Sequence, residues 1–151
     1  MVTRLIRFAA VFVGLFLVAG AAACKNDTTL PTPELATEVF TGTLAPGATK
    51  SHNFNVNYAF SSSTATLTVN SLTDAATGTA LSTTIGAGFG QPGFDGSCVL
   101  VTSYSTQTAT IGVELGPAPV TQGQFCVQVF DAGTLTNLGV SANYSVTVKH
   151  Y

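Results

Sequence analysis

The chain has 151 residues, of which 46% are hydrophobic and only 8% are charged. Beyond residue 23 it carries three lysines against seven carboxylates, a net charge of −4, so it lacks the clustered cations of a nucleic-acid-binding surface. Thr, Ser, Asn and Gln supply most of the polar positions. This composition and length suit one exported β-rich domain with a sizeable core.

The first 23 residues are typical of an export signal. Arg4 and Arg7 precede an apolar run at residues 8–20, and small side chains follow it. The run is short for a membrane-spanning helix, which needs roughly 20 apolar residues. We therefore predict that residues 1–23 are a signal peptide and that the protein is exported.

Cys24 directly follows three alanines, an arrangement that resembles the lipidation site of bacterial lipoproteins. The resemblance implies that Cys24 is acylated, becomes the mature N-terminus and anchors the protein to a membrane. Because Lys25 stands where an aspartate would resemble an inner-membrane retention signal, it favours the outer membrane or cell surface. Ala21 occupies the place of the usual leucine, so ordinary cleavage after Ala23 and an uncleaved anchor stay open as alternatives.

Residues 24–37 are polar, contain two prolines and show no period, so we predict a flexible tether. From residue 38 onward, turn signals separate short β-rich runs with no helical pattern. The predicted strands lie at 39–44, 51–58, 65–69, 79–85, 98–104, 108–115, 124–131 and 144–148. Residues 38–151 are therefore expected to form an all-β domain, an antiparallel two-sheet sandwich of about eight strands, with a closed barrel as the alternative.

The run at residues 124–131 is the predicted central strand. Phe125, Val127 and Val129 alternate with Cys126 and other residues, which is the period of a strand with one buried face. In the second strand, Phe54, Val56 and Tyr58 are expected to point inward. Leu72 falls out of phase with the third strand, which indicates a bulge or a strand end there.

Cys98 and Cys126 are predicted to form a disulfide. In each strand the main aliphatic residues lie on the face opposite the cysteine, so both sulfurs can lie on one side of neighbouring strands. Cysteines that enter an oxidising compartment normally pair. Free thiols or a metal pair are the alternatives.

The stretch at residues 86–96 is rich in glycine and holds Phe89, Phe94 and Asp95. It is not a phosphate-binding loop, since no lysine follows and no helix begins after it. We expect a candidate binding loop with Phe89 buried and Phe94 exposed. The alternative is that both rings only close the end of the sandwich.

Catalytic and metal-binding signals are weak. His52 and His150 lie in different strands with no acid or nucleophile beside them, and no Gly-x-Ser-x-Gly is present. Asp95 and Asp131 lie beside glycines, a turn chemistry that needs no ion. The sequence therefore predicts no enzyme, no catalytic residue, no metal site and no cofactor, although a lone calcium site near Asp74 or Asp95 stays open.

Four segments in order resemble the bacterial pre-peptidase C-terminal (PPC) domain: residues 40–44, 51–56, 123–129 and 144–148. The resemblance implies a jelly-roll-like sandwich that serves secreted hydrolases as a targeting, stabilising or polymer-binding module. Ser51 stands where members often carry an acid, so a calcium role does not transfer to it, and the cysteine pair is not general in the family.

Two functions follow as hypotheses. The first is a non-enzymatic cell-envelope lipoprotein whose sandwich binds an envelope polysaccharide or a surface protein. The second is a structural surface or filament subunit that associates through its edge strands.

Overall fold

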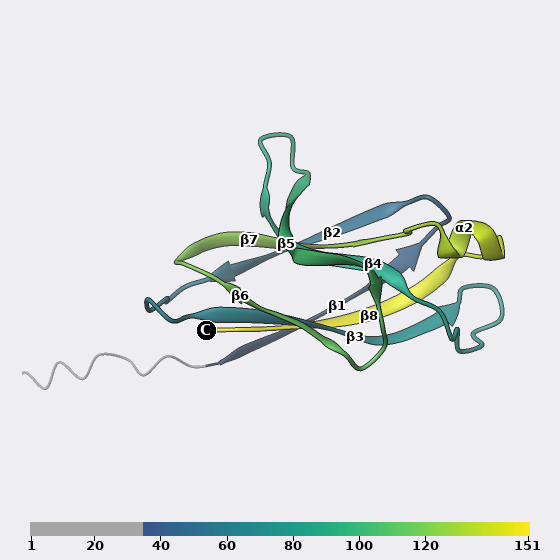
Figure 1. The fold of residues 1–151 in the computed structure, drawn as a ribbon, viewed down its shortest axis with the longest axis horizontal. Helices are drawn as coiled ribbons and strands as arrows, with labels where there is room; N and C mark the ends of the chain where they lie inside the picture. The colour runs from purple at the N-terminus through teal and green to yellow at the C-terminus, as the bar shows by residue number, and fades with distance from the viewer. Residues whose placement is uncertain (1–34) are drawn as a thin grey trace, which may run out of the picture. The chain divides into compact units, whose positions relative to one another are not determined.

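The computed structural model describes residues 35–151 (Figure 1). The predicted signal peptide, Cys24 and most of the predicted tether lie outside these residues. In the described part, eight strands and one short helix follow one another: β1 (Ala36–Leu44), β2 (Thr49–Val56), β3 (Thr64–Asp74), β4 (Ile85–Pro92), β5 (Cys98–Ala109), β6 (Glu114–Pro119), β7 (Gly123–Phe130), α2 (Thr134–Leu138) and β8 (Ala142–His150).

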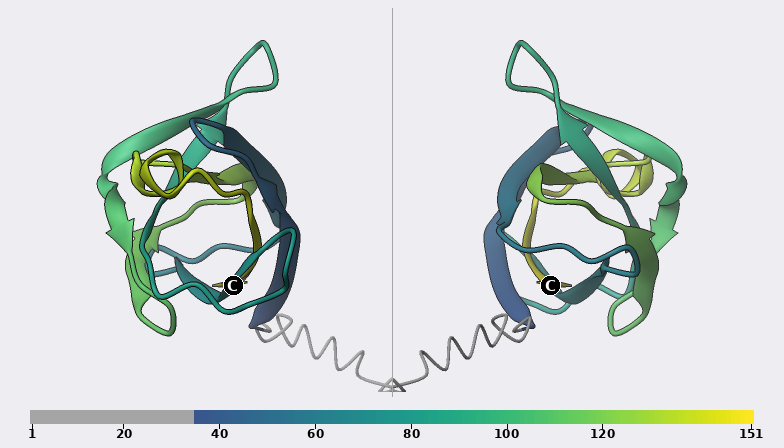
Figure 2. Two further views of the ribbon diagram at one scale, coloured as in Figure 1. Left: turned by 90° about the vertical axis from the view of Figure 1, so that its right-hand side faces the viewer. Right: turned by 90° about the vertical axis from the view of Figure 1, so that its left-hand side faces the viewer.

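The strands form two four-stranded antiparallel sheets, which confirms the predicted two-sheet sandwich. Sheet A has the order β1-β8-β3-β6, and sheet B has the order β2-β7-β4-β5. Successive strands mostly alternate between the sheets, which is the connectivity of a jelly roll. The end-on views of Figure 2 show the strands of both sheets around the core.

Alternation of apolar and polar residues places one face of each sheet in the core. In β8 the even-numbered residues are buried and their neighbours are not, and β7 buries Val127 and Val129 as predicted. The predicted irregularity before Leu72 is a register shift between Val69 and Ser71. The largest fully buried side chains are Phe54, Leu44, Leu67, Leu72, Ile85, Leu135, Val56, Val69, Val127, Val129, Val146 and Val148.

The fourth strand was placed wrongly from the sequence. Residues 79–84 make only an isolated bridge at Ala80. Residues 86–92 of the predicted glycine-rich loop instead belong to strand β4, which is buried from Ile85 to Gly90, and only residues 93–96 form a turn. Each glycine lies where a side chain would collide with a neighbour; a Cβ on Gly86 would lie 2.2 Å from the Phe130 ring. Glycine here permits close packing rather than a turn.

Other boundaries also differ from the prediction. Strand β5 extends to Ala109, and the strand predicted at 108–115 is replaced by β6 at Glu114–Pro119. Tyr58 lies beyond the end of β2 and is exposed, because the strand ends at Val56. No helix was expected beyond residue 38, but α2 lies before β8, and its five residues are too few to show a helical period. Strand β1 begins at Ala36, inside the predicted tether.

Candidate functional site: the β4–β5 hairpin

The turn between β4 and β5, residues 93–97, projects from the sandwich (Figures 1 and 2). It is closed by two backbone hydrogen bonds, from Gly93 N to the Ser97 carbonyl at 2.7 Å and from Gly96 N to the Gly93 carbonyl at 3.1 Å. Gly96 has a positive φ of 80°, a conformation that glycine adopts without strain. The tip of the hairpin therefore has a defined shape.

Asp95 holds the turn together through hydrogen bonds to Ser97. Its Oδ1 accepts hydrogen bonds from the Ser97 hydroxyl at 2.6 Å and the Ser97 amide at 3.0 Å. These bonds, led by that of the hydroxyl, lower the pKa of Asp95. Within residues 35–151, no three His, Cys, Asp or Glu side chains lie close enough together to hold a metal ion.

The two phenylalanines have the environments that the sequence predicts. Phe89 is 3% exposed and packs edge-on against Phe54, with ring centroids 6.3 Å apart. Phe94 is fully exposed at 115%, and Val99 on the same hairpin is 60% exposed. The hairpin therefore carries an apolar surface that the fold leaves in water. A role in binding stays a prediction.

An apolar crevice of about 210 Å³ lies near the base of the hairpin. Phe89, Val101, Tyr104 and Phe125 line it together with residues 118–120 of β6 and the segment after it. Its size is below that of a typical site for a drug-sized ligand, about 300–1,000 Å³. We therefore treat it as an extension of the hairpin surface rather than as a separate small-molecule site.

The disulfide anchors the hairpin. Cys98, the first residue of β5, is bonded to Cys126 in β7, with Cα atoms 5.8 Å apart, which confirms the predicted pair. The two strands are not neighbours as expected, because β4 lies between them in the sheet. The bond passes close to Gly90, where a Cβ would lie 2.9 Å from Cys98 Sγ and 2.3 Å from the Val99 carbonyl oxygen.

His52 and His150 each contact a residue of the other sheet, and the sequence did not predict these contacts. The Nε2 of His52 in β2 lies 2.7 Å from the Tyr144 hydroxyl in β8, and its ring stacks on Phe40. Burial and then the charge of Lys50 lower the pKa of His52. Burial raises the pKa of Tyr144.

His150 is 3% exposed, and its Nε2 lies 2.9 Å from Glu38 Oε1, while its ring packs on Phe54. The sequence shows no acid beside either histidine, but the fold brings Glu38 to His150. Because their partners are up to 112 residues away, only the strand register could have revealed them. The contact of His52 with Tyr144 and the packing of His150 on Phe54 connect sheet A to sheet B, whereas His150 and Glu38 both lie in sheet A.

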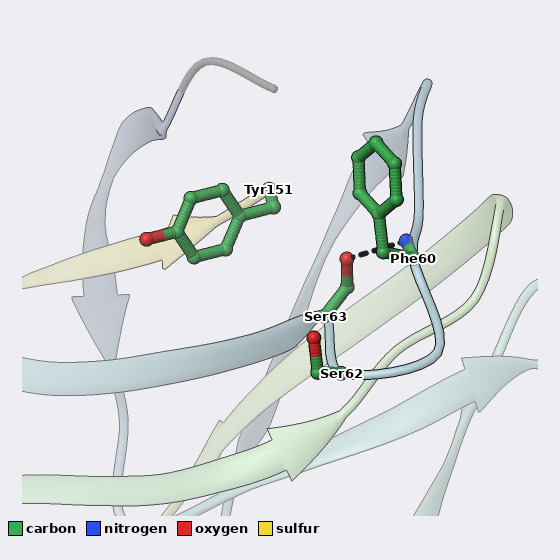
Figure 3. A pocket seen from close by; sticks show the side chains of 4 residues that line it. All are labelled: Phe60, Ser62, Ser63 and Tyr151. Atoms are coloured by element: carbon green, nitrogen blue, oxygen red, sulfur yellow. Dashed lines mark hydrogen bonds between the residues drawn. The ribbon is translucent and has the colours of Figure 1, made fainter. Parts of the chain in front are cut away.

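A second concave site lies where the segment between β2 and β3 meets the end of β8. Phe60, Ser62, Ser63 and Tyr151 line a pocket of about 390 Å³ (Figure 3). Phe60 is 49% exposed and Tyr151 is 42% exposed, whereas Ser63 is buried at 5%. The sequence analysis did not single out this pocket, because its residues belong to segments far apart in the chain.

Asp131 and Asp74 are turn residues. Asp131 accepts five hydrogen bonds, from the amides of Gly47, Gly133, Leu135 and Thr136 and from the Thr136 hydroxyl. Asp74 accepts from the amides of Ala76 and Thr77. Both carboxylates therefore accept hydrogen bonds from backbone amides of their own turns, as the sequence predicts for Asp131, and Asp131 also accepts one from Gly47 in the β1–β2 turn.

The structure does not test the predicted lipidation of Cys24, which lies outside the described residues. No helix in the part of the chain that the structure describes is long and apolar enough to cross a membrane.

Comparisons with known proteins show a distant likeness to solved structures. No family model matches the chain, and no curated protein matches it. Among solved structures, PliG of Aeromonas hydrophila, a periplasmic inhibitor of g-type lysozyme, aligns with 16% identity and a TM-score of 0.43. The match covers 76% of this chain and 86% of that chain. A likeness at this level supports no inference about function.

Proposed function

We propose that the chain is an exported, non-enzymatic protein of the cell envelope that binds a protein partner through the β4–β5 hairpin. The observation that carries this proposal is the fully exposed ring of Phe94 on an ordered, projecting turn. Burying a phenylalanine side chain against a partner contributes about 1.5–3 kcal/mol. In the free chain the same ring makes no buried contact that would stabilise the fold.

The surroundings of the ring support a binding role. The turn is preorganised by Asp95 and by the disulfide at its base, so little conformational entropy is lost when a partner binds. Val99 extends the apolar surface down the hairpin. Aromatic anchors that insert into a partner's pocket carry much of the binding energy of protein interfaces.

Export and anchoring belong to the same proposal. The Cys98–Cys126 bond fits an oxidising compartment, and we place lipid at Cys24 and the domain at the outer membrane or cell surface. Intact-mass measurement of the protein extracted from membranes tests the anchor. We expect a chain that begins at Cys24 and carries acyl mass; an uncleaved or unacylated chain contradicts it. That the domain is related to the PPC modules of secreted hydrolases stays a hypothesis.

The test of binding compares Phe94→Ala with a matched control. Val113 is also exposed, at 61%, but it lies outside the hairpin, so Val113→Ala removes exposed apolar surface at a different place on the molecule. Full-length proteins are immobilised in detergent and exposed to envelope extract. We expect one or more proteins to bind the wild type and Val113→Ala but not Phe94→Ala. Equal capture by all three proteins would exclude the hairpin.

Self-association through edge strands is the second candidate. Strands β1 and β2 each pair on one side only, are nine and eight residues long, and contain no proline. By contrast, β6 carries Pro117 and Pro119, which protect an edge. Sedimentation of the full-length protein in detergent tests this candidate. A monomer at high concentration rejects it, whereas oligomers that Val39→Lys dissolves would favour it over the hairpin.

A further inference from the structure

The pocket of Phe60, Ser62, Ser63 and Tyr151 combines two aromatic rings, one of them a phenol, with two serine hydroxyls. Figure 3 shows the rings standing on two sides of the serines. Phe60 and Tyr151 are each nearly half exposed, so neither residue is fully buried in the core. None of the four lining side chains carries a charge at neutral pH. These side chains offer apolar faces and neutral hydrogen-bonding groups.

The hydrogen bonding of Ser63 leaves its proton for a ligand. The Phe60 amide donates to Ser63 Oγ at 2.8 Å, so the oxygen acts as an acceptor within the protein. A hydroxyl has one proton to donate in addition to its lone pairs. The Ser63 amide and carbonyl are also used, by the Phe60 carbonyl and the Val120 amide, which fixes the position of the residue.

We propose that this pocket binds one ring of a neutral oligosaccharide. A pyranose ring has an apolar C–H face and a rim of hydroxyls that both donate and accept. The aromatic rings match the apolar face, and the serine hydroxyls match the rim. We favour a neutral over an anionic polysaccharide, because the four lining side chains offer no cation and the chain beyond residue 23 has a net negative charge. The site is separate from the hairpin of the proposed function.

Saturation-transfer NMR on the full-length protein in detergent micelles tests the site with four probes. Cellotetraose, chitotetraose and maltotetraose are neutral and differ in linkage or substituent, and tetragalacturonate is the charged counterpart. We expect at least one neutral probe to receive saturation, most strongly at the C–H protons of one sugar face, and tetragalacturonate to receive none. No transfer to any of the neutral probes, or equal transfer to the charged one, overturns the proposal.

Variants connect binding to the pocket. Phe60→Ala and Tyr151→Ala should each weaken affinity about tenfold, because each removes an aromatic face. Tyr151→Phe keeps the face and should stay within about twofold of the wild type. The melting temperature of each variant shows whether the fold is intact. Unchanged affinity in both alanine variants would overturn the site, as would loss in Tyr151→Phe equal to that in Tyr151→Ala.

The two proposals can fail separately. Phe94→Ala should lose the protein partner and keep the sugar, whereas Tyr151→Ala should lose the sugar and keep the partner. Loss of sugar binding in Phe94→Ala with an unchanged melting temperature would move the sugar to the hairpin and overturn the pocket.

Discussion

Inward and outward residues alternate with a period of two both in sheet A and in β4 of the β4–β5 hairpin, but the outward residues of the two regions differ. In β1, β8 and β3 the outward residues are mostly Thr, Ser and Asn, and the sheet register sets Thr41, Ser145 and Ser71 side by side. In β4 the outward residues are Gly86, Gly88 and Gly90. The alternation therefore indicates a strand in both regions. The type of outward residue determines whether the outer face is exposed to water or packed against another part of the chain.

The glycine face of β4 is covered by its own chain. The Phe130 ring lies over Gly86, Ser105 and Leu100 lie over Gly88, and the backbone of Val99 lies over Gly90. Register shifts in the β4–β5 pair accommodate this cover. The outer face of sheet A instead stays in contact with water and satisfies part of its own hydrogen bonding.

Asn70 shows how sheet A does this. It lies in the bulge of β3, and its Nδ2 donates to Ser145 Oγ at 3.2 Å and to Thr147 Oγ1 at 2.8 Å. The Thr43 hydroxyl donates to Asn143 Oδ1 at 2.6 Å. These contacts are exposed, so each contributes little to stability, and substitutions on this face should be tolerated far better than substitutions on β4.

The largest effect is expected for the inward side of β4. Phe89→Ala removes a buried ring that packs on Phe54, and it should lower the free energy of unfolding by about 4 kcal/mol. Urea denaturation followed by circular dichroism measures the loss. Phe94→Ala, on the same hairpin but fully exposed, should change it by less than about 0.5 kcal/mol. Similar losses at both positions would mean that the turn folds back onto the domain.

The outward side of β4 comes next. Gly90→Ala adds one methyl group that would lie 2.3 Å from a carbonyl oxygen, and backbone cannot rotate away as a side chain can. We expect a loss of about 3 kcal/mol in the free energy of unfolding. Ser71→Thr adds one methyl group to the open face of sheet A and is the matched control, with a change within about 0.5 kcal/mol. Equal tolerance at the two positions would show that the face of β4 is open.

The contrast explains which elements the sequence could predict. Alternating Phe54 and Val56, or Tyr144, Val146 and Val148, predicted strands correctly because their outward neighbours are polar. Strand β4 has the same alternation in Ile85, Ala87 and Phe89. Its glycines were interpreted as turn signals, although a glycine at every second position also indicates close approach of another part of the chain.

Long-range contacts explain what the sequence could not predict of the sites. The cysteine pair follows from residue type and export, but the passage of their bond across β4 depends on the strand order. The exposure of Phe94 follows from the turn residues on both sides of it. By contrast, the pocket at Phe60 and Tyr151 forms only when the 90 residues between them fold back, and no local sequence pattern indicates that.

Asp131 lies outside both regions, in the connections between the sheets, and its substitution should have an intermediate effect on stability. It follows β7 of sheet B, and its Oδ2 accepts a hydrogen bond from Gly47 in the turn between β1 and β2. Asp131→Asn loses the charge that strengthens these bonds and should cost about 2 kcal/mol at pH 7. Chemical denaturation at pH 7 measures the cost. A loss below about 0.5 kcal/mol would mean that the bonds contribute nothing net.

The pH dependence of the same pair of proteins separates charge from packing. Desolvation raises the pKa of Asp131, but hydrogen bonds from Gly47, Thr136 and Leu135 outweigh it and lower the pKa from 3.8. Because the pKa of Asp131 is lower in the folded chain than in the unfolded chain, ionised Asp131 stabilises the fold at pH values above the unfolded-state pKa. This stabilisation is lost as the pH falls below about 4. The difference between the wild type and Asp131→Asn should therefore narrow between about pH 4 and pH 2. A constant difference would assign the effect to packing.

The smallest effect belongs to the hydroxyls of sheet A. Thr41→Val keeps the shape and the branched Cβ that suit a strand, and replaces an exposed hydroxyl with a methyl group. Because water and neighbouring hydroxyls satisfy this position equally well in the folded and unfolded chains, we expect a change within about 0.5 kcal/mol in urea denaturation. Thr49→Val, exposed on β2, is the control on the other sheet. A loss above about 1 kcal/mol for Thr41→Val alone would show that the hydroxyl rows stabilise the fold, and the outer face of sheet A would then be as closed to substitution as that of β4.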